Sequence, residues 1–313
     1  MEHVTLADVQ AARERVGAKL RRTPVFTSRT LGPGVHLKAE LFQPTGSFKV
    51  RGVLNKLATL TPEERERGVI GISAGNHAQA LAWGAREEGL DALLVMWASA
   101  SEQKIAATRG YGAAIDLEAP DPSSAFDRLE VLIAESGRTL VHPFDDPVVQ
   151  AGAGTCGLEI VEDVPAVDTV LVACGGGGLV AGIAAAVRGL RPDARIVAVE
   201  PEGSAALHQA LRAGHPVPVP TDSIADALAA PFAGGNGLAA CQDYGVESML
   251  VSEQEIADAF RFLYARAKLA CEPGAAAAVA PVLSGRIEGG TIVCVVSGGN
   301  VAAQTASAIL TSA

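Results

Sequence analysis

The chain has 313 residues, of which 49% are hydrophobic and 19% are charged, a balance typical of a globular protein with a large core and not of a disordered chain. Its 25 basic and 35 acidic residues give a formal net charge of −10, which argues against nucleic acid and anionic membranes as partners because both call for a basic face. No apolar run approaches the roughly 18 to 20 uncharged residues that a membrane span needs.

The N-terminal segment predicts a capped amphipathic helix, because Thr5 and Asp8 have the spacing of a capping box. The same segment lacks the uncharged core of a signal peptide, so we expect a cytoplasmic protein. Five cysteines are widely spaced and form no C-x-x-C pair, which favours buried free thiols.

Strand-like apolar runs alternate with helix-length amphipathic segments along most of the chain. The runs cover residues 69–73, 92–96, 113–117, 139–144, 169–174, 195–200 and 291–297. This alternation predicts an α/β fold with mostly parallel sheets that are covered by helices on both faces, in two αβα domains. A charged helix is expected after Ser252, with Glu255 as its capping-box partner. The stretch 214–244, rich in Pro and Gly, is interpreted as an ordered loop region.

Three of these strands run into glycine-containing turns that open predicted helices. The turns are S-A-G-N-H (73–77), C-G-G-G-G-L (174–179) and S-G-G-N (297–300). Ligands of open α/β sheets gather at the carboxyl ends of the strands, where such turns lie. Glycine lets the backbone come close to a ligand, and the amides of a helix start bind anions, so residues 175–178 predict a phosphate cradle.

The second turn also fits a different cofactor. Gly176-x-Gly178-x-x-Ala181 follows a strand and opens a helix, and Glu200 ends the next strand. These are the positions that a nicotinamide-binding Rossmann unit uses, with the acidic residue on the ribose. Taken alone, this stretch would favour an oxidoreductase.

Upstream, residues 38–52 read K-A-E-L-F-Q-P-T-G-S-F-K-V-R-G, and Lys49 stands where a glycine turn meets a helical run. A single lysine is ordinarily a solvated surface charge. A lysine amine near a phosphate cradle, however, is the arrangement that holds an aldehyde cofactor.

The segments G-S-F-K-V-R-G, S-A-G-N-H-A-Q, G-G-G-G-L and S-G-G-N occur in this order. From about residue 22 to residue 302, the chain resembles the fold-type-II pyridoxal-phosphate enzymes, in the threonine/serine dehydratase branch that includes serine racemase. The resemblance implies a large cofactor-binding domain (1–67 and 145–313) and a small domain (68–144), with pyridoxal 5'-phosphate in the cleft between them. It also implies a homodimer.

Roles for individual residues follow from the same resemblance. Lys49 would hold the cofactor as a Schiff base and remove the α-proton of the substrate, with Phe48 beside the ring. Asn76 would hydrogen-bond the phenolic oxygen, and Ser297 would meet the pyridine nitrogen. The phosphate would be bound by the backbone amides of Gly175, Gly176, Gly177, Gly178 and Leu179. The substrate carboxylate would be gripped by the turn of Ser73, Asn76 and His77, although a helix-face role for the histidine is an equal alternative.

The implied activity is that of an ammonia-lyase (dehydratase) that converts L-threonine or L-serine to a 2-oxo acid and ammonia. A dehydratase of another 3-hydroxy amino acid, such as 3-hydroxyaspartate, a serine racemase and a nicotinamide-dependent oxidoreductase are the alternatives. Ala74 stands where serine racemase has the serine that protonates the opposite face, which favours dehydration.

The metal site of the racemases uses the equivalents of Glu200, the Ser204 carbonyl and an aspartate that is Ala206 here, so we expect no metal. Other departures, such as Ala227 in I-A-D-A and the segment E-P-G-A (272–275) in place of E-P-T-G, concern the identity of the substrate.

Overall fold

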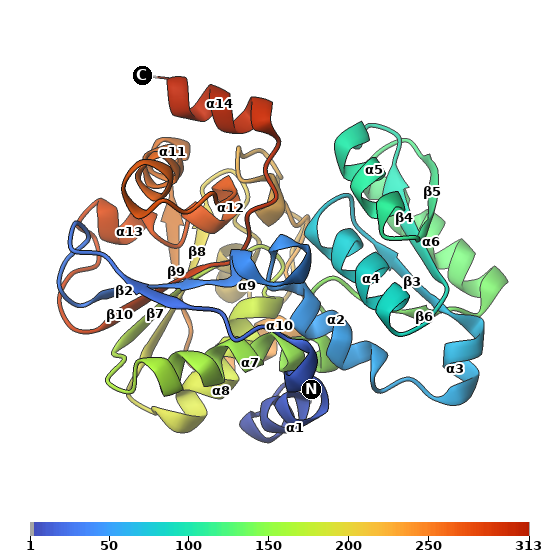
Figure 1. Cartoon of the computed structure of the whole chain (residues 1–313), viewed down its shortest axis with the longest axis horizontal. Helices are drawn as coiled ribbons and strands as arrows, with labels where there is room; N and C mark the ends of the chain where they lie inside the picture. The colour runs from blue at the N-terminus through green and yellow to red at the C-terminus, as the bar shows by residue number, and fades with distance from the viewer. Residues whose placement is uncertain (1–2, 313) are drawn as a thin grey trace.

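The computed structural model describes residues 3–312, except for the side chains of residues 122 and 123. Its strands form a six-stranded sheet of order β1-β2-β10-β7-β8-β9 and a four-stranded sheet of order β5-β4-β3-β6 (Figure 1). The larger sheet consists of β1 (Val25–Thr27), β2 (Val35–Ala39), β7 (Thr169–Ala173), β8 (Arg195–Pro201), β9 (Glu247–Val251) and β10 (Ile292–Val296). The smaller sheet consists of β3 (Val69–Ile72), β4 (Ala92–Trp97), β5 (Ala114–Ala119) and β6 (Thr139–Leu140).

The pairing of β1 with β2 is antiparallel, and the other strand pairs of the described residues are parallel. The predicted α/β class with mostly parallel sheets is therefore confirmed.

Helices cover both faces of the larger sheet. Alternate residues of a strand point to opposite faces, and in β7 Leu171 joins one apolar cluster while Val170 and Val172 join another. The first cluster lies under α11 (Glu253–Phe262), α12 (Pro273–Ala276), α13 (Ala280–Leu283) and α14 (Ala303–Thr311). The second lies under α7 (Pro147–Asp163), α8 (Gly178–Leu190), α9 (Ala206–Ala213) and α10 (Gly235–Asp243), with α1 (Leu6–Val16) packed outside α7 and α8.

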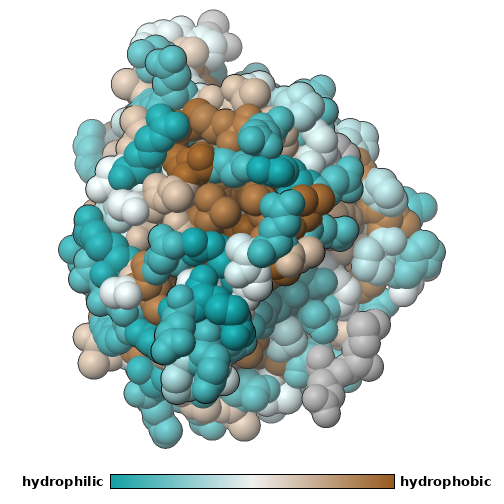
Figure 2. Space-filling model, turned by 90° about the vertical axis from the view of Figure 1, so that its right-hand side faces the viewer, coloured by the Kyte–Doolittle hydropathy of each residue, from teal (hydrophilic) through white to brown (hydrophobic). Residues whose placement is uncertain are grey.

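The smaller sheet has α4 (Asn76–Glu87) and α5 (Glu102–Gly110) on one face and α6 (Pro122–Ser136) on the other. Helix α2 (Lys49–Leu57) lies between the two sheets and packs against both α7 and α4, and α3 (Pro62–Arg67) follows it (Figure 1). Seen from the side of the smaller sheet, apolar surface gathers in the middle of the molecule within a hydrophilic surround (Figure 2).

Two predicted helix starts are confirmed, because Thr5 with Asp8 and Ser252 with Glu255 both form capping boxes. The loop predicted for 214–244 is wrong in part, since it contains α10 and the single turn η4 (Asp226–Leu228). The start of α10 is held from outside the segment, where Asp145 accepts hydrogen bonds from the amides of Gly235 (3.0 Å) and Asn236 (2.9 Å).

Every strand of the smaller sheet comes from residues 69–140, whereas the division into domains at 68 and 144 stays a prediction. Among the described residues, no helix is long and apolar enough to cross a membrane.

Candidate active site

Two of the three glycine turns meet the segment that carries Lys49. Phe48 donates its backbone N–H to the carbonyl of Ser297 (3.0 Å), and Ser47 forms an isolated antiparallel bridge with Gly298. The side chain of Asn300 donates to both the Thr45 carbonyl (2.7 Å) and Asn76 Oδ1 (2.8 Å). The turn after β10 is thus joined to residues 45–49 by direct hydrogen bonds, and Asn300 of that turn links the turn after β3 to the same segment.

Lys49 is the first residue of α2 and is partly buried. Its Nζ donates to the Pro143 carbonyl (2.6 Å) and lies 5.1 Å from the centre of the Phe48 ring. Burial lowers the pKa of this amine to about 8, and the nearby Glu272 carboxylate opposes the shift. A substantial fraction of Lys49 is therefore neutral near pH 8, as a nucleophilic amine must be.

The turn of four glycines lies against Phe144, the residue that follows the partner of Lys49. A Cβ on Gly176 would lie 2.4 Å from the Phe144 ring, and one on Gly178 would lie 2.8 Å from the Phe144 carbonyl oxygen. On Gly175 it would lie 2.9 Å from the carbonyl oxygen of Leu228. Gly177 has space around it but adopts a φ of +94°, which disfavours other residues. Each of the four positions therefore has its own structural reason to be glycine. Phe144 links this turn to the Lys49 amine, because it follows the Pro143 carbonyl that Lys49 contacts.

The same turn offers an anion site. Among the described residues, no acceptor is recorded for the backbone N–H groups of Gly175, Gly176, Gly178 and Leu179, although the Gly176 carbonyl accepts from Gly234 (3.0 Å). The last two of these amides begin α8, whose N-terminus carries partial positive charge. This cradle fits the phosphate that the sequence predicts.

A second set of amide donors begins α4. In the described part of the chain, the N–H groups of Asn76, His77 and Ala78 have no recorded acceptor, whereas the Gly75 N–H donates to Ser73 Oγ (3.0 Å). Ser73 thus shapes the turn before the helix, and the free amides suit a carboxylate.

The side chain of His77 turns away from this anion site. It is 2% exposed, its Nε2 pairs with the Val141 carbonyl (2.8 Å), and burial followed by the charge of Lys49 lowers its pKa to about 3. A neutral, buried ring with a backbone partner favours the helix-face alternative over direct substrate contact.

Sequence reasoning missed the carboxyl group that contacts Asn76. Asn76 Nδ2 donates to Glu272 Oε1 (2.7 Å), and Glu272 is 3% exposed, immediately before α12. Burial raises the pKa of Glu272 to about 7, although the hydrogen bond from Asn76 opposes the shift. The available signal was a glutamate directly before Pro273 in an apolar stretch, where a buried carboxyl group needs a partner.

Glu200 does not have the environment that the Rossmann interpretation requires. It is fully buried, and its two carboxylate oxygens accept from the amides of Leu207 (2.7 Å) and His208 (2.8 Å) at the start of α9. Its carboxylate therefore caps a helix instead of facing a ribose. Ser204 donates its hydroxyl to the Leu228 carbonyl (3.2 Å), and Ala206 is the first residue of α9, while the expectation of no metal stays a prediction.

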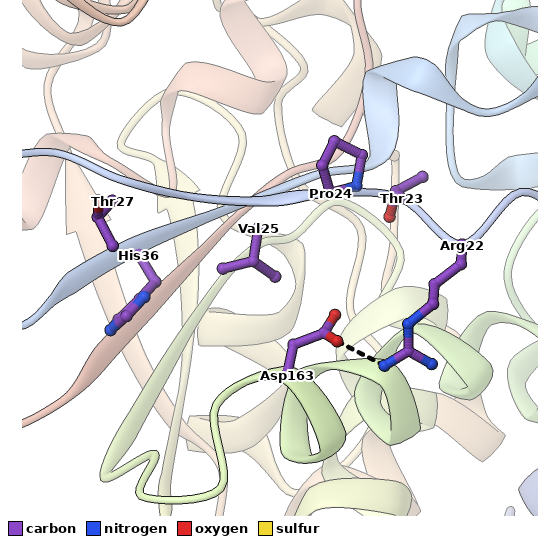
Figure 3. Close-up of a pocket in the computed structure, with 7 residues that line it drawn as sticks. All are labelled: Arg22, Thr23, Pro24, Val25, Thr27, His36 and Asp163. Atoms are coloured by element: carbon purple, nitrogen blue, oxygen red, sulfur yellow. Dashed lines mark hydrogen bonds and ion pairs between the residues drawn. The ribbon is translucent and has the colours of Figure 1, made fainter.

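Two surface pockets lie elsewhere. One of about 440 Å³ is lined by Arg22, Thr23, Pro24, Val25, Thr27, His36 and Asp163 (Figure 3). The other, of about 350 Å³, is lined by residues of α1 and α7 and reaches Arg51. Neither contains Lys49 or the four glycines, so the candidate site is identified by the chemistry of its residues.

Comparisons with known proteins agree with this assignment. A family model described as "Pyridoxal-phosphate dependent enzyme" matches residues 17–298. The chain is 39% identical to an L-threonine ammonia-lyase of Thermotoga maritima over 304 residues, which cover 95% of this chain and 76% of that protein.

Two solved structures have the same fold. Maize serine racemase aligns with a TM-score of 0.93 and 32% identity, over 97% of this chain and 96% of the racemase. A threonine deaminase from T.th. aligns with a TM-score of 0.90 and 36% identity, over 95% of this chain and 99% of the deaminase.

Proposed function

Because this chain belongs to the family of pyridoxal-phosphate-dependent enzymes, we propose that it is an ammonia-lyase that converts L-threonine or L-serine to a 2-oxo acid and ammonia. The observation that carries the proposal is the grouping of a partly neutral Lys49 amine with two separate sets of free helix-start amides. One set suits a phosphate and the other a substrate carboxylate, so the two sets together would bind both anions of an amino-acid reaction.

The residues present fit the cofactor. Gly175, Gly176, Gly178 and Leu179 would bind its phosphate through their amides. Once bound, pyridoxal phosphate supplies an electron sink for the pair left on the α-carbon. Ser297, at the carboxyl end of β10, would meet the pyridine nitrogen, and a hydroxyl group there does not enforce protonation as a carboxylate would. A pyridine nitrogen that is not fully protonated suits prompt loss of a β-substituent.

The chain's own groups would then act on the substrate. The free amides of Asn76, His77 and Ala78 would bind the α-carboxylate and fix the orientation of the amino acid. Lys49 would take the α-proton onto Nζ, which its lowered pKa makes a suitable base near neutral pH. Asn76, already held by Asn300 and Glu272, keeps one amide hydrogen for the phenolic oxygen of the cofactor.

The alternatives differ in their support. Racemisation needs a proton donor on each face, and the methyl group of Ala74, which is 8% exposed, cannot supply one. A nicotinamide-dependent activity loses its support because the Glu200 carboxylate caps α9 instead of facing a ribose. A 3-hydroxyaspartate dehydratase remains an outcome of the substrate assay.

The remaining predictions belong to the same proposal. We assign residues 1–67 and 145–313 to a cofactor-binding domain and 68–144 to a smaller domain that together close over the cofactor. We also propose a homodimer in the cytoplasm, with Phe48 flanking the cofactor ring and Gly177 completing the phosphate cradle.

A substrate panel tests the activity. The purified protein with bound cofactor is incubated with L-threonine, L-serine and L-threo-3-hydroxyaspartate, and 2-oxo acid and ammonia are measured. We expect equal amounts of both products from threonine or serine, and their loss in Lys49→Ala but not in Lys56→Ala, which lies on the same helix. Cofactor-loaded protein that yields no 2-oxo acid from threonine or serine would overturn the proposal, and product from L-threo-3-hydroxyaspartate alone would favour that alternative.

A further inference from the structure

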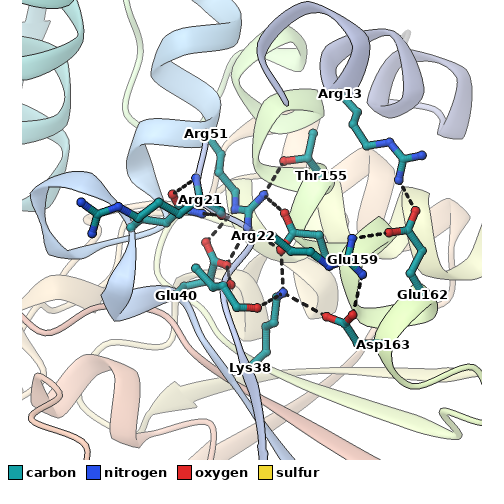
Figure 4. Close-up of polar contacts among 12 residues, drawn as sticks. Arg13, Arg21, Arg22, Lys38, Glu40, Arg51, Thr155, Glu159, Glu162 and Asp163 are labelled. Carbon is teal, nitrogen blue, oxygen red and sulfur yellow. Dashed lines mark hydrogen bonds and ion pairs between the residues drawn. The ribbon is translucent and has the colours of Figure 1, made fainter. Parts of the chain in front are cut away.

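A buried ionic network centred on Arg51 connects α2 with α7 and with the end of β2 (Figure 4). Arg51 is 0% exposed, and its guanidinium donates to both oxygens of Glu40 (2.7 and 2.8 Å) and to both oxygens of Glu159 (2.8 and 3.0 Å). A further bond reaches Thr155 Oγ1 (2.9 Å). Lys38 joins the network through Glu159 (2.5 Å) and also pairs with Asp163 (3.5 Å), so two buried cations face three carboxylates.

The network connects three elements that surround the candidate site. Glu40 follows β2 directly, Glu159 and Thr155 lie in α7, and Arg51 lies in the first turn of α2. Arg51 therefore fixes α2 both to the larger sheet and to α7. Its backbone N–H also donates to the Phe48 carbonyl (3.0 Å) and closes the turn that carries Lys49.

Lys49 and Arg51 leave this turn in different directions. Residues two apart on a helix do not face each other, since each residue turns the helix by about 100°. Accordingly, Lys49 reaches the Pro143 carbonyl, while Arg51 reaches the carboxylates behind the helix. A rotation of the first turn would move the Lys49 amine, and the contacts of Arg51 oppose such a rotation.

Stability alone does not explain the network. Burial by itself would raise the pKa of Glu40, but the adjacent guanidinium holds it below its usual range, so the pair stays ionised. A buried ion pair is often no more stabilising than an apolar replacement of the same shape, because both charges lose their hydration. What the planar, doubly paired guanidinium does supply is a fixed orientation.

We infer that Arg51 is a positioning residue, which through Glu40 and Glu159 fixes the first turn of α2 and thereby aims the Lys49 amine at the cofactor. This inference rests on the proposed role of Lys49. It assigns no contact with substrate or cofactor to Arg51 itself.

Two variants of the cofactor-loaded protein test the inference. Arg51→Lys keeps the charge and loses the paired geometry. The triple variant Arg51→Met/Glu40→Gln/Glu159→Gln removes the charges of Arg51 and its two partners together, while Lys38 keeps the Asp163 carboxylate as its ion-pair partner (3.5 Å). We expect kcat to fall on the order of 10- to 100-fold in both, the effect of a displacement of about 1 Å at a reacting group. KM should stay within about twofold, because the α4 amides that bind substrate are not altered. The absorbance band of the lysine-bound cofactor should change in position or shape.

The control is Lys56→Met, which removes a cation from the last turn of the same helix, where it pairs with Asp146 (2.7 Å). We expect it to keep the wild-type kcat and absorbance band. A triple variant with wild-type kcat and spectrum would overturn the inference, and so would an equal loss of kcat in Lys56→Met. A triple variant that does not fold would also overturn it, because the network would then serve stability.

A separate measurement on the wild-type protein tests the proposed function itself. Borohydride reduction and peptide mapping of the wild-type protein show whether Lys49 holds the cofactor. A different lysine would overturn the proposed function, whereas Lys49 with unaffected Arg51 variants would overturn only the positioning role.

Discussion

The side-chain amide of Asn76 donates a 2.7 Å hydrogen bond to Glu272, a carboxyl group that is 3% exposed. Asn300 donates in turn to Asn76, so the turn after β3 is tied to segments near β10 and α12. The contact joins the two sheets at the place where the substrate is proposed to bind.

Glu272→Gln should stabilise the protein more at higher pH. Burial raises the folded-state pKa of Glu272 from 4.5 to about 7, so between these values the native protein keeps a proton that the unfolded chain loses. Wild-type stability therefore falls with rising pH across this window, a loss that the glutamine variant does not share. We expect the melting temperature of the variant, relative to wild type, to increase from pH 5 to pH 8. The exposed Glu202→Gln serves as a control, and a difference that does not vary with pH would contradict the assignment.

Gly177→Asp should weaken cofactor binding while the fold is retained. Gly177 has a φ of +94°, and its nearest obstacle to a Cβ is Gly237 at 3.8 Å. Asp and Asn tolerate left-handed backbone better than most residues, so both variants should fold. The added carboxylate repels a phosphate, and we expect the Kd for pyridoxal phosphate to rise on the order of 10- to 100-fold. Gly177→Asn is the uncharged control, and equal affinities of the two variants in an absorbance titration would rule out the cradle.

Ala74→Ser should raise the share of racemisation. Ala74 is 8% exposed, next to the free amides that begin α4, and a hydroxyl group at this position could supply the second proton that racemisation needs. We expect wild-type protein to give 2-oxo acid with little D-amino acid from L-serine or L-threonine. Chiral chromatography measures both products. Abundant D-isomer from the wild-type protein would mean that another group already donates the second proton.

Lys104→Met should reduce substrate affinity in a salt-dependent manner. Lys104 on α5 pairs with Asp226 of η4 at 2.5 Å, a contact between the helices of one sheet and a loop of the other. Exposed ion pairs contribute only about 0 to 1 kcal/mol to stability. This pair, however, joins α5 to η4 close enough to Glu272 for both of its charges to affect the pKa of that carboxyl group. We expect KM to rise severalfold at about 10 mM salt and the difference from wild type to shrink near 1 M, where charges are screened within about 3 Å.

Asp226→Asn should behave in the same way, and the double variant should be no worse than either single one. Arg195→Met removes an exposed pair within the larger sheet (2.8 Å from Glu247) and is the matched control. A salt-independent effect would contradict the electrostatic explanation.

The convergence of the turns after β7 and β10 was predictable from sequence, because the carboxyl ends of neighbouring parallel strands meet at one edge of a sheet. The turn after β3 belongs to the smaller sheet, so its approach to the other two depends on how the two sheets are arranged. Strand β2 was not predicted, since His36 and Lys38 interrupt its apolar pattern. The structure shows why this is tolerated: Lys38 is fully buried but paired with Glu159, 121 positions away.

The hydrogen-bond and packing partners of the predicted site residues could not be predicted from the sequence either. Glu272 lies 196 positions from Asn76, and the packing of Phe144 on the four glycines depends on how the two sheets are arranged. Such contacts are set by tertiary packing and leave no periodic signal in the chain.

The identity of the cofactor-binding lysine tests the account most directly. The protein is purified with its cofactor, reduced with borohydride, digested and mapped by mass spectrometry, with Lys49→Ala treated in parallel. We predict a single reduced cofactor on the peptide that contains Lys49, whose Nζ lies 2.6 Å from the Pro143 carbonyl beside the glycine turn, and none in the variant. Reduced cofactor on another lysine, or an unmodified protein despite bound pyridoxal phosphate, would contradict it.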